Sequence, residues 1–201
     1  MKLTVIGATG MIGSRVVTEA LTRGHEVAAG SRAGTPVEGT TPVAIDLGDT
    51  DSVVALIEGS DATVLTVPPS REGGSHQPTL EAHRALIAAG PAGRVLVVGG
   101  AGALSVGDVL LKDTPDFPAI YKPEADTFAA VLDLYRNAGP SLDWTMLAPA
   151  PVIAPGERTG SYRVGLDSPV GDFVSAEDFA AALVDELETP SHRRQRFTVA
   201  N

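Results

Sequence analysis

The sequence predicts an α/β fold, a doubly wound parallel sheet with helices on both faces. Apolar, strand-like runs alternate with helix-like segments from the first residues onward. The runs are apolar along their whole length, which is typical of parallel strands buried on both faces. Right-handed crossovers between successive strands then give the doubly wound arrangement.

Six strands are expected before residue 150, at 3–6, 26–30, 42–45, 62–67, 94–98 and 144–147. Four helices are expected between them, at 11–23, 49–58, 77–89 and 123–137. Asp49 or Thr50 supplies an N-cap for the second helix. The last two helices each end at a glycine followed by a proline, a combination that stops a helix.

The character of the chain changes at Ala150, where proline and glycine become frequent. A short strand is expected at 161–164, a helix at 175–187 and a last strand at 195–200. Ser175 is expected to cap that helix. We therefore expect one domain, 1–201, with a core at 1–149. The small C-terminal segment, 150–201, should cover the substrate at the carboxyl ends of the sheet.

The composition excludes several classes of protein. A formal net charge of -10 disfavours nucleic acid as a partner, because an acidic surface repels phosphate backbones. The chain has no cysteine, which excludes thiol catalysis. No apolar run approaches the ~20 residues that span a bilayer. We expect a cytoplasmic protein without membrane contacts, either a monomer or a homodimer.

A glycine-rich loop, Gly7-Ala8-Thr9-Gly10-Met11-Ile12-Gly13, lies directly between the first strand and the first helix. Gly7 allows a sharp turn, Gly10 lets the backbone approach a pyrophosphate, and Gly13 lets helix and strand pack closely. Free N–H groups at the start of the helix then hold the phosphates. The placement indicates a Rossmann fold that binds a nicotinamide dinucleotide.

The residues after the second strand favour NADP over NAD. Proteins that bind NAD place an Asp or Glu there, whereas Ser31 and Arg32 follow Gly30 here. Arginine forms charge-assisted, often bidentate contacts with phosphate. The alternative is that Arg32 is only a solvated loop cation, and NAD stays open. Asp46 is either an acceptor for the adenine amino group or a turn residue.

The glycine loop resembles that of atypical short-chain dehydrogenases/reductases. Other segments resemble small NAD(P)H-binding proteins assigned as NADH-flavin reductases, which are relatives of biliverdin-IXβ reductase. These segments are Val97–Gly102, Leu142–Thr145, Pro149-Ala150, Pro155–Gly160 and Arg196–Val199.

The resemblance implies a set of cofactor contacts: Gly7, Thr9, Gly10, Met11, Ile12, Arg32, Asp46 and Leu47. It also implies that Thr66-Val67-Pro68 and Val98-Gly99-Gly100 run beneath the ribose and nicotinamide. Pro149-Ala150 would then border the nicotinamide pocket, with Ala101 on the substrate side.

The sequence departs from the family at the catalytic triad. Typical short-chain dehydrogenases carry Tyr-x-x-x-Lys, but Tyr121 is followed by Ala125 at the lysine position. The usual serine is also missing from Gly99–Gly102. Hydride transfer to a flavin or another conjugated acceptor does not need the triad, because the ring of the acceptor holds the developing charge.

Tyr121, Lys122 and His76 are the candidate catalytic residues. Tyr121 could donate a proton or orient the substrate, with Lys122 favouring its ionised form, or it could simply pack at the start of a helix. His76 could relay a proton. Arg71, in the same loop as His76, could hold an anionic substrate, although the loop could equally be mobile surface.

Arg158 and Tyr162 follow a Pro-Gly-Glu-Arg-Thr-Gly turn and could close the substrate pocket. Glu157 and Arg158 could equally form a local surface pair of little energetic weight. The four histidines show no metal-ligand spacing, so no metal is expected.

The sequence as a whole predicts an NADP(H)-dependent oxidoreductase. It would transfer hydride from the nicotinamide to a flavin-like or other conjugated small molecule. Two alternatives stay open, a non-catalytic NAD(P) sensor and an isomerase or epimerase that retains its cofactor. The missing triad is what favours the sensor.

Overall fold

The structure, a computed structural model that describes residues 1–201, is built on one eight-stranded sheet. The strand order is β10-β12-β8-β5-β4-β1-β2-β3. The strands are β1 (Lys2–Ile6), β2 (Glu26–Ser31), β3 (Thr41–Ala44), β4 (Ala62–Leu65), β5 (Arg94–Val98), β8 (Asp143–Ala148), β10 (Arg163–Gly165) and β12 (Arg196–Ala200). All neighbours are parallel except β10 and β12. From β1 the chain winds outward in both directions, so the doubly wound fold is confirmed.

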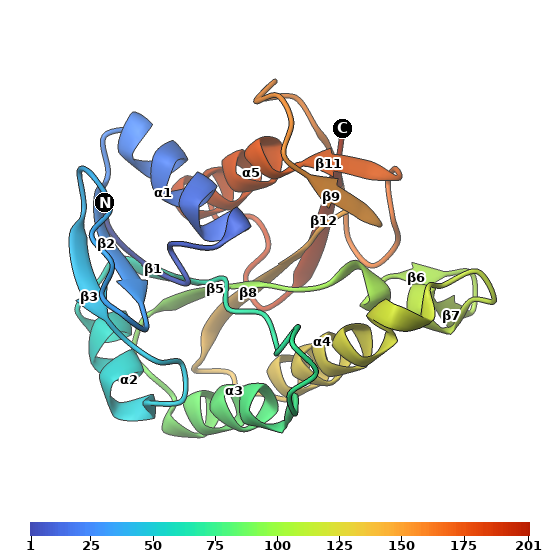
Figure 1. Cartoon of the computed structure of the whole chain (residues 1–201), viewed down its shortest axis with the longest axis horizontal. Helices are drawn as coiled ribbons and strands as arrows, with labels where there is room; N and C mark the ends of the chain where they lie inside the picture. The colour runs from blue at the N-terminus through green and yellow to red at the C-terminus, as the bar shows by residue number, and fades with distance from the viewer.

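Helices cover both faces of the sheet (Figure 1). One face carries α1 (Met11–Thr22) and α5 (Ala176–Glu188), and the other carries α2 (Thr50–Glu58), α3 (Gln77–Ala89) and α4 (Lys122–Arg136). Each face encloses a cluster of buried apolar side chains, one containing Phe179 and the other Trp144 and Tyr135. None of the helices combines the length and apolar character needed to cross a bilayer.

The helix N-termini differ in how they are capped. Asp49 Oδ1 accepts a hydrogen bond from the Ser52 amide at the start of α2, and Ser175 Oγ accepts one from the Asp178 amide at the start of α5. By contrast, α1 has Gly10 at the N-cap position, no side-chain cap and no acidic residue in its first turn. The amides at the start of α1 are therefore left for another partner.

The C-terminal segment differs from the expected cover. The strand β12 lies inside the main sheet between β8 and β10, and α5 packs against α1. Both elements complete the core, because their buried side chains belong to the cluster around Phe179. The part that follows the carboxyl end of β8 is smaller. It pairs β9 (Val152–Ala154) with β11 (Phe173–Ser175).

Several short elements have no counterpart in the sequence-based expectation. A hairpin of β6 (Ser105–Val106) and β7 (Val109–Leu110) follows the turn η1 (Ala101–Ala103), and η2 (Leu111–Asp113) and η3 (Ala119–Tyr121) lead into α4. Elements of two or three residues are too short for a hydrophobic period to show. The fourth strand also ends at Leu65, two residues earlier than expected.

Candidate functional site

The glycine loop packs tightly against the end of β4. Gly7 has φ +92°, and a side chain there would overlap the Thr66 hydroxyl. A side chain at Gly13 would overlap the Gly7 carbonyl. At Gly10, in contrast, an added Cβ would meet only the Gly7 carbonyl oxygen, at 3.3 Å. Gly7 and Gly13 are thus required by packing, while Gly10 leaves the outer side of the turn open.

The start of α1 presents a group of backbone amides without partners. The loop itself is held by the amides of Gly7 and Ala8, which both donate to the Gly30 carbonyl. No protein acceptor pairs with the amides of Thr9, Met11, Ile12 and Gly13. Unpaired N–H groups at a helix N-terminus form an anion site. These residues fit a pyrophosphate, which would accept hydrogen bonds from the free amides.

Two residues at the end of β2 lie beside this turn. Ser31 Oγ accepts a hydrogen bond from the Thr35 amide at 2.9 Å, so its own hydroxyl hydrogen is free to donate. Arg32 is exposed and takes part in no ion pair or side-chain hydrogen bond. No carboxylate stands at the end of this strand. The local charge is therefore positive and unneutralised, which suits a phosphate group.

Asp46, which follows β3, is expected either to accept from the adenine amino group or to form a turn, and its two carboxylate oxygens differ in this respect. One carboxylate oxygen of Asp46, Oδ1, accepts a hydrogen bond from the Gly48 amide at 2.8 Å and so forms a turn. The other oxygen has no partner in the protein and is free to accept. Leu47 is buried in the core cluster on the α2 and α3 side of the sheet.

The ends of β4, β5 and β8 form the floor next to the glycine loop, because β4 is the neighbour of β1 in the sheet and β5 and β8 follow it in order. The Thr66 hydroxyl donates to the carbonyls of Ile6 and Gly7 at 3.0 and 3.1 Å. The Gly99 amide donates to the Leu147 carbonyl at 2.8 Å. The other residues expected here, which include both exposed and buried positions, are Val67, Pro68, Val98, Gly100, Ala101, Pro149 and Ala150.

The turn η1 packs directly against the first part of α4. A Cβ at Gly102 would lie 2.5 Å from Cβ of Ala125, and Ala125 is only 6% exposed. The helix and the turn thus approach each other as closely as their small side chains permit. A long side chain at position 125 would push them apart.

Three of the candidate chemical residues lie together at the start of α4. Arg71 forms a two-point ion pair with Glu124, with its Nη2 at 2.7 Å from Oε1. Glu124, and more weakly Tyr121 nearby, raise the pKa of Arg71. His76 contacts Thr127, also on α4. The sequence did not indicate Glu124 or Thr127, because each lies about fifty residues from its partner.

Lys122 does not join this group. Its ammonium donates to the Lys112 carbonyl at 3.1 Å and to Asp113 Oδ1 at 2.9 Å. The hydrogen bond from Lys122, together with one from Lys112, lowers the pKa of Asp113. The charge of Lys122, expected from the sequence to act on Tyr121, is instead paired with Asp113. Tyr121 itself is 60% exposed.

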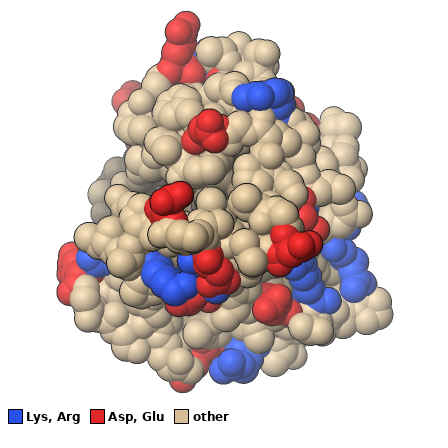
Figure 2. Space-filling model, turned by 90° about the vertical axis from the view of Figure 1, so that its right-hand side faces the viewer, with Lys and Arg blue, Asp and Glu red and all other residues tan.

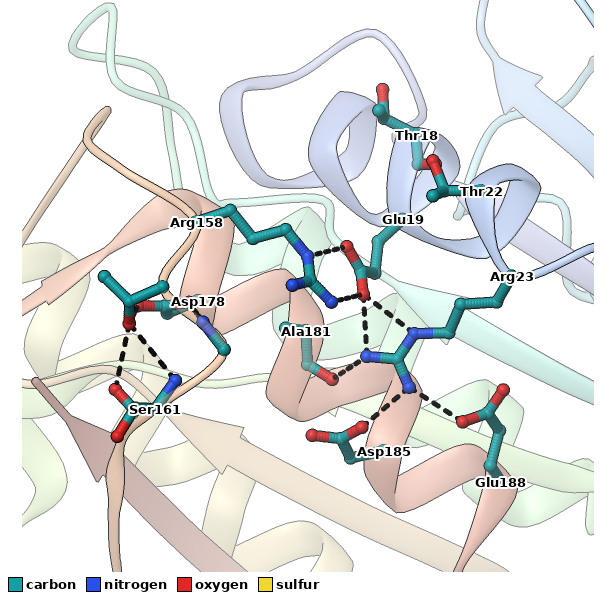
Figure 3. Close-up of polar contacts among 12 residues, drawn as sticks. Thr18, Glu19, Thr22, Arg23, Arg158, Ser161, Asp178, Ala181, Asp185 and Glu188 are labelled. Carbon is teal, nitrogen blue, oxygen red and sulfur yellow. Dashed lines mark hydrogen bonds and ion pairs between the residues drawn. The ribbon is translucent and has the colours of Figure 1, made fainter.

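Arg158 and Tyr162, expected from the sequence to close the substrate pocket, both bind acidic side chains on the helices α1 and α5. Figure 3 shows the Arg158 guanidinium donating to both carboxylate oxygens of Glu19 on α1, at 2.6 Å each. The Tyr162 hydroxyl donates to Asp185, in the third turn of α5. Both side chains hold the 155–162 segment against the outer side of α1 and α5. They are bound there by acidic groups that the sequence could not place.

Charged groups form no large patch of one sign on the face that Figure 2 shows. Figure 2 shows the side of the molecule that carries β6 and β7 at the right of Figure 1. Acidic and basic side chains are interspersed there among uncharged surface. A charged ligand at this face would be recognised by individual side chains rather than by a broad field.

A sequence model described as NAD(P)H-binding matches residues 7–190. The chain belongs to this NAD(P)H-binding family. The match spans the glycine loop and most of the fold, so the family expected from the sequence is confirmed, and a nicotinamide dinucleotide is its cofactor class.

Full-length relatives agree with this assignment. The uncharacterized protein YwnB of Bacillus subtilis (strain 168) is 38% identical over 214 residues, covering 100% of this chain and 99% of YwnB. A candidate NADH-flavin reductase from Streptococcus pneumoniae is 34% identical, with a TM-score of 0.85 and coverage of 100% and 99% of the two chains. A candidate epimerase from Bacteroides thetaiotaomicron is 33% identical, with a TM-score of 0.87 and coverage of 99% and 96%.

Proposed function

We propose that this protein is an NADP(H)-dependent reductase that delivers hydride to a flavin-like or other conjugated small molecule. The proposal rests on two features taken together. The amides at the start of α1 are free, and Arg32 at the end of β2 has no carboxylate partner. Together they offer donors for the pyrophosphate and a cation for the 2′-phosphate.

The preference for NADP over NAD rests on charge. An acid at the end of β2 would accept from the ribose hydroxyls of NAD and repel a 2′-phosphate. Here no acid is present, and Arg32 has no carboxylate partner to compete with a phosphate. Ser31 adds a hydroxyl that is free to donate. The remaining family contacts, among them Asp46, serve both cofactors alike.

The choice of a conjugated acceptor rests on the packing at the start of α4. Position 125, where the lysine of a Ser-Tyr-Lys triad is expected, carries a buried alanine that packs against Gly102. A simple carbonyl would lack that triad to protonate its developing alkoxide, whereas a flavin-like ring carries the charge itself. Exposed Tyr121 would then orient the ring of the acceptor rather than donate the proton.

Turnover tests the proposal directly. NADPH oxidation is followed by absorbance with FMN, FAD and a quinone as acceptors, with and without the protein. We expect protein-dependent oxidation with at least one of them. Tyr121→Phe, which keeps the ring, should retain most of the rate, whereas Tyr121→Ala should lose about fivefold, the equivalent of about 1 kcal/mol of aromatic contact. Tight NADPH binding without oxidation would instead favour the sensor.

An epimerase that retains its cofactor is the second candidate, since a relative with that assignment shares the whole fold. Such an enzyme would return the hydride to its substrate in each cycle. The purified protein would then carry bound dinucleotide and consume no NADPH. Release of a nicotinamide dinucleotide on denaturation, together with absence of NADPH consumption, would replace the reductase proposal.

A further inference from the structure

The connection between β4 and α3 is held on the molecule almost entirely by side chains. It runs from Thr66, beneath the glycine loop, to His76 at the start of α3. Residues 67–75 make no backbone-to-backbone hydrogen bond. Within the loop, the amides of Glu72 and Gly74 donate only to Ser70 Oγ. A small number of side-chain contacts therefore decides where this loop lies.

The first of these contacts joins Arg71 to Glu124 in the first turn of α4. Nε and Nη2 of Arg71 lie 3.0 and 2.7 Å from the two carboxylate oxygens. The paired geometry fixes the direction of the loop. It contributes little free energy, because the Arg71 side chain is 64% exposed. The pair brings the loop beside Tyr121.

The second contact is the His76 ring, which faces oxygen acceptors on both sides. Its Nε2 lies 2.8 Å from the Ser70 carbonyl, while its Nδ1 lies 2.8 Å from Thr127 Oγ1 and 3.1 Å from the Pro123 carbonyl. A carbonyl can only accept, and a neutral imidazole has one N–H. The neutral ring must therefore leave a lone pair facing one carbonyl. The protonated ring donates on both sides.

Thr127 sharpens this requirement. Its hydroxyl lies 2.8 Å from both the Pro123 carbonyl and Nδ1, and its one hydrogen can be donated to only one of them. With the ring neutral and bonded to Ser70, Thr127 would have to abandon Pro123 to satisfy Nδ1. Protonation removes the conflict, because Nδ1–H then donates toward both oxygens.

We propose that residues 69–76 form a lid over the acceptor side of the nicotinamide pocket and that protonation of His76 holds the lid closed. This inference rests on the proposed function, because only that function places Tyr121 at the border of the acceptor site.

The charged groups on the elements around His76 do not contact its ring. On α4, Glu124 is bound by Arg71, Lys122 by Asp113, and Asp126 by Lys112. On α3, Glu81 accepts from Gln77, and in the loop Glu72 is exposed. None of them contacts the ring, so the proton on His76 itself sets the number of donors.

The absence of cysteine makes the lid directly observable. Glu72→Cys, at the exposed part of the loop, introduces the single thiol of the chain for a nitroxide spin label. The mobility of the label is compared at about pH 6 and about pH 8, a range in which histidine commonly changes charge. We expect a shift from a slow to a fast spectral component as the pH rises. A label that is equally mobile at both pH values would overturn the lid.

Two variants separate the contacts. His76→Gln has one donor and one acceptor at every pH, so the pH response of the label should be lost. Glu124→Gln should make the label more mobile at both pH values while the response to pH persists. A pH response that survives in His76→Gln would overturn the role given to the ring. Unchanged mobility in Glu124→Gln would overturn the role given to Arg71 and Glu124.

NADPH binding to the same labelled protein distinguishes the two proposals. If the mobility of the label does not change with pH in a protein that binds NADPH, the lid proposal is wrong and the proposed cofactor site is unaffected. A pH-responsive label in a protein that binds neither NADPH nor NADH would overturn the proposed function instead.

Discussion

The outer seam between α1 and α5 and the glycine loop use charged groups in opposite ways. At the seam, Glu19 accepts from both Arg158 and Arg23, and Arg23 also binds Asp185 (Figure 3). At the glycine loop, Arg32 has no ion pair. What distinguishes the glycine loop from the seam is that its polar groups still need partners.

The electrostatics of the seam fit a structural role. Hydrogen bonds from Arg158, and then from Arg23, lower the pKa of Glu19 despite its burial. A carboxylate with a lowered pKa stabilises the folded protein above its ordinary range, and this contribution is lost as the pH falls through the folded pKa. The seam therefore stabilises the C-terminal segment at neutral pH and offers no free charge to a ligand.

The largest expected effect concerns the two kinds of glycine in the glycine loop. Gly13→Ala should lower the free energy of unfolding by about 3 kcal/mol, because the new methyl overlaps the Gly7 carbonyl. Gly10→Ala should change it by less than about 1 kcal/mol, since the backbone there is extended, with φ -78° and ψ 172°. The measurement is urea unfolding of both variants.

The same two variants distinguish an effect on stability from an effect on cofactor binding. Gly10→Ala should still weaken NADPH binding, because its methyl would stand where the pyrophosphate approaches. If Gly13→Ala were as stable as the wild type, the close packing of α1 on the loop would be wrong.

A second effect concerns His83, whose side chain is buried in the core. His83 Nδ1 lies 3.1 Å from the Tyr135 hydroxyl, and burial lowers the pKa of His83 to about 4. Between about pH 6.5 and about pH 4 the unfolded chain binds the proton more readily, so stability should fall by about 3 kcal/mol as the pH drops through that window. His83→Gln should lack this part of the decline. Parallel pH profiles of unfolding for the two proteins would contradict a neutral, buried His83.

A smaller effect tests the seam. Arg158→Ala should lower the free energy of unfolding by about 1 kcal/mol, since Glu19 keeps Arg23 as a partner. NADPH affinity should not change. Arg84→Ala, which removes an exposed arginine without an ion pair, is the matched control and should alter neither quantity. A loss of turnover in Arg158→Ala without a loss of stability would support a role for Arg158 in the substrate pocket.

The sequence was most informative where the signal is local. The glycine loop could be predicted because its turn, strand and helix are adjacent in the chain, and the longer buried strands show a clear apolar pattern. Arg158 could not be assigned correctly, because Glu19 lies 139 residues away. Likewise, β9 and β11 are three residues each and are separated by a long segment. Their pairing depends on tertiary contacts that no local period reveals.

The proposed preference for NADP(H) depends on whether Arg32 binds the 2′-phosphate. Calorimetric titration of NADPH and NADH into wild type and Arg32→Ala measures this directly. We expect the wild type to prefer NADPH. In Arg32→Ala the affinity for NADPH should fall about tenfold to a hundredfold, the equivalent of a charged hydrogen bond, with no change for NADH. An equal loss for both cofactors, or none for NADPH, would contradict the assignment of Arg32. Failure of the wild type to bind either dinucleotide would contradict the site as a whole.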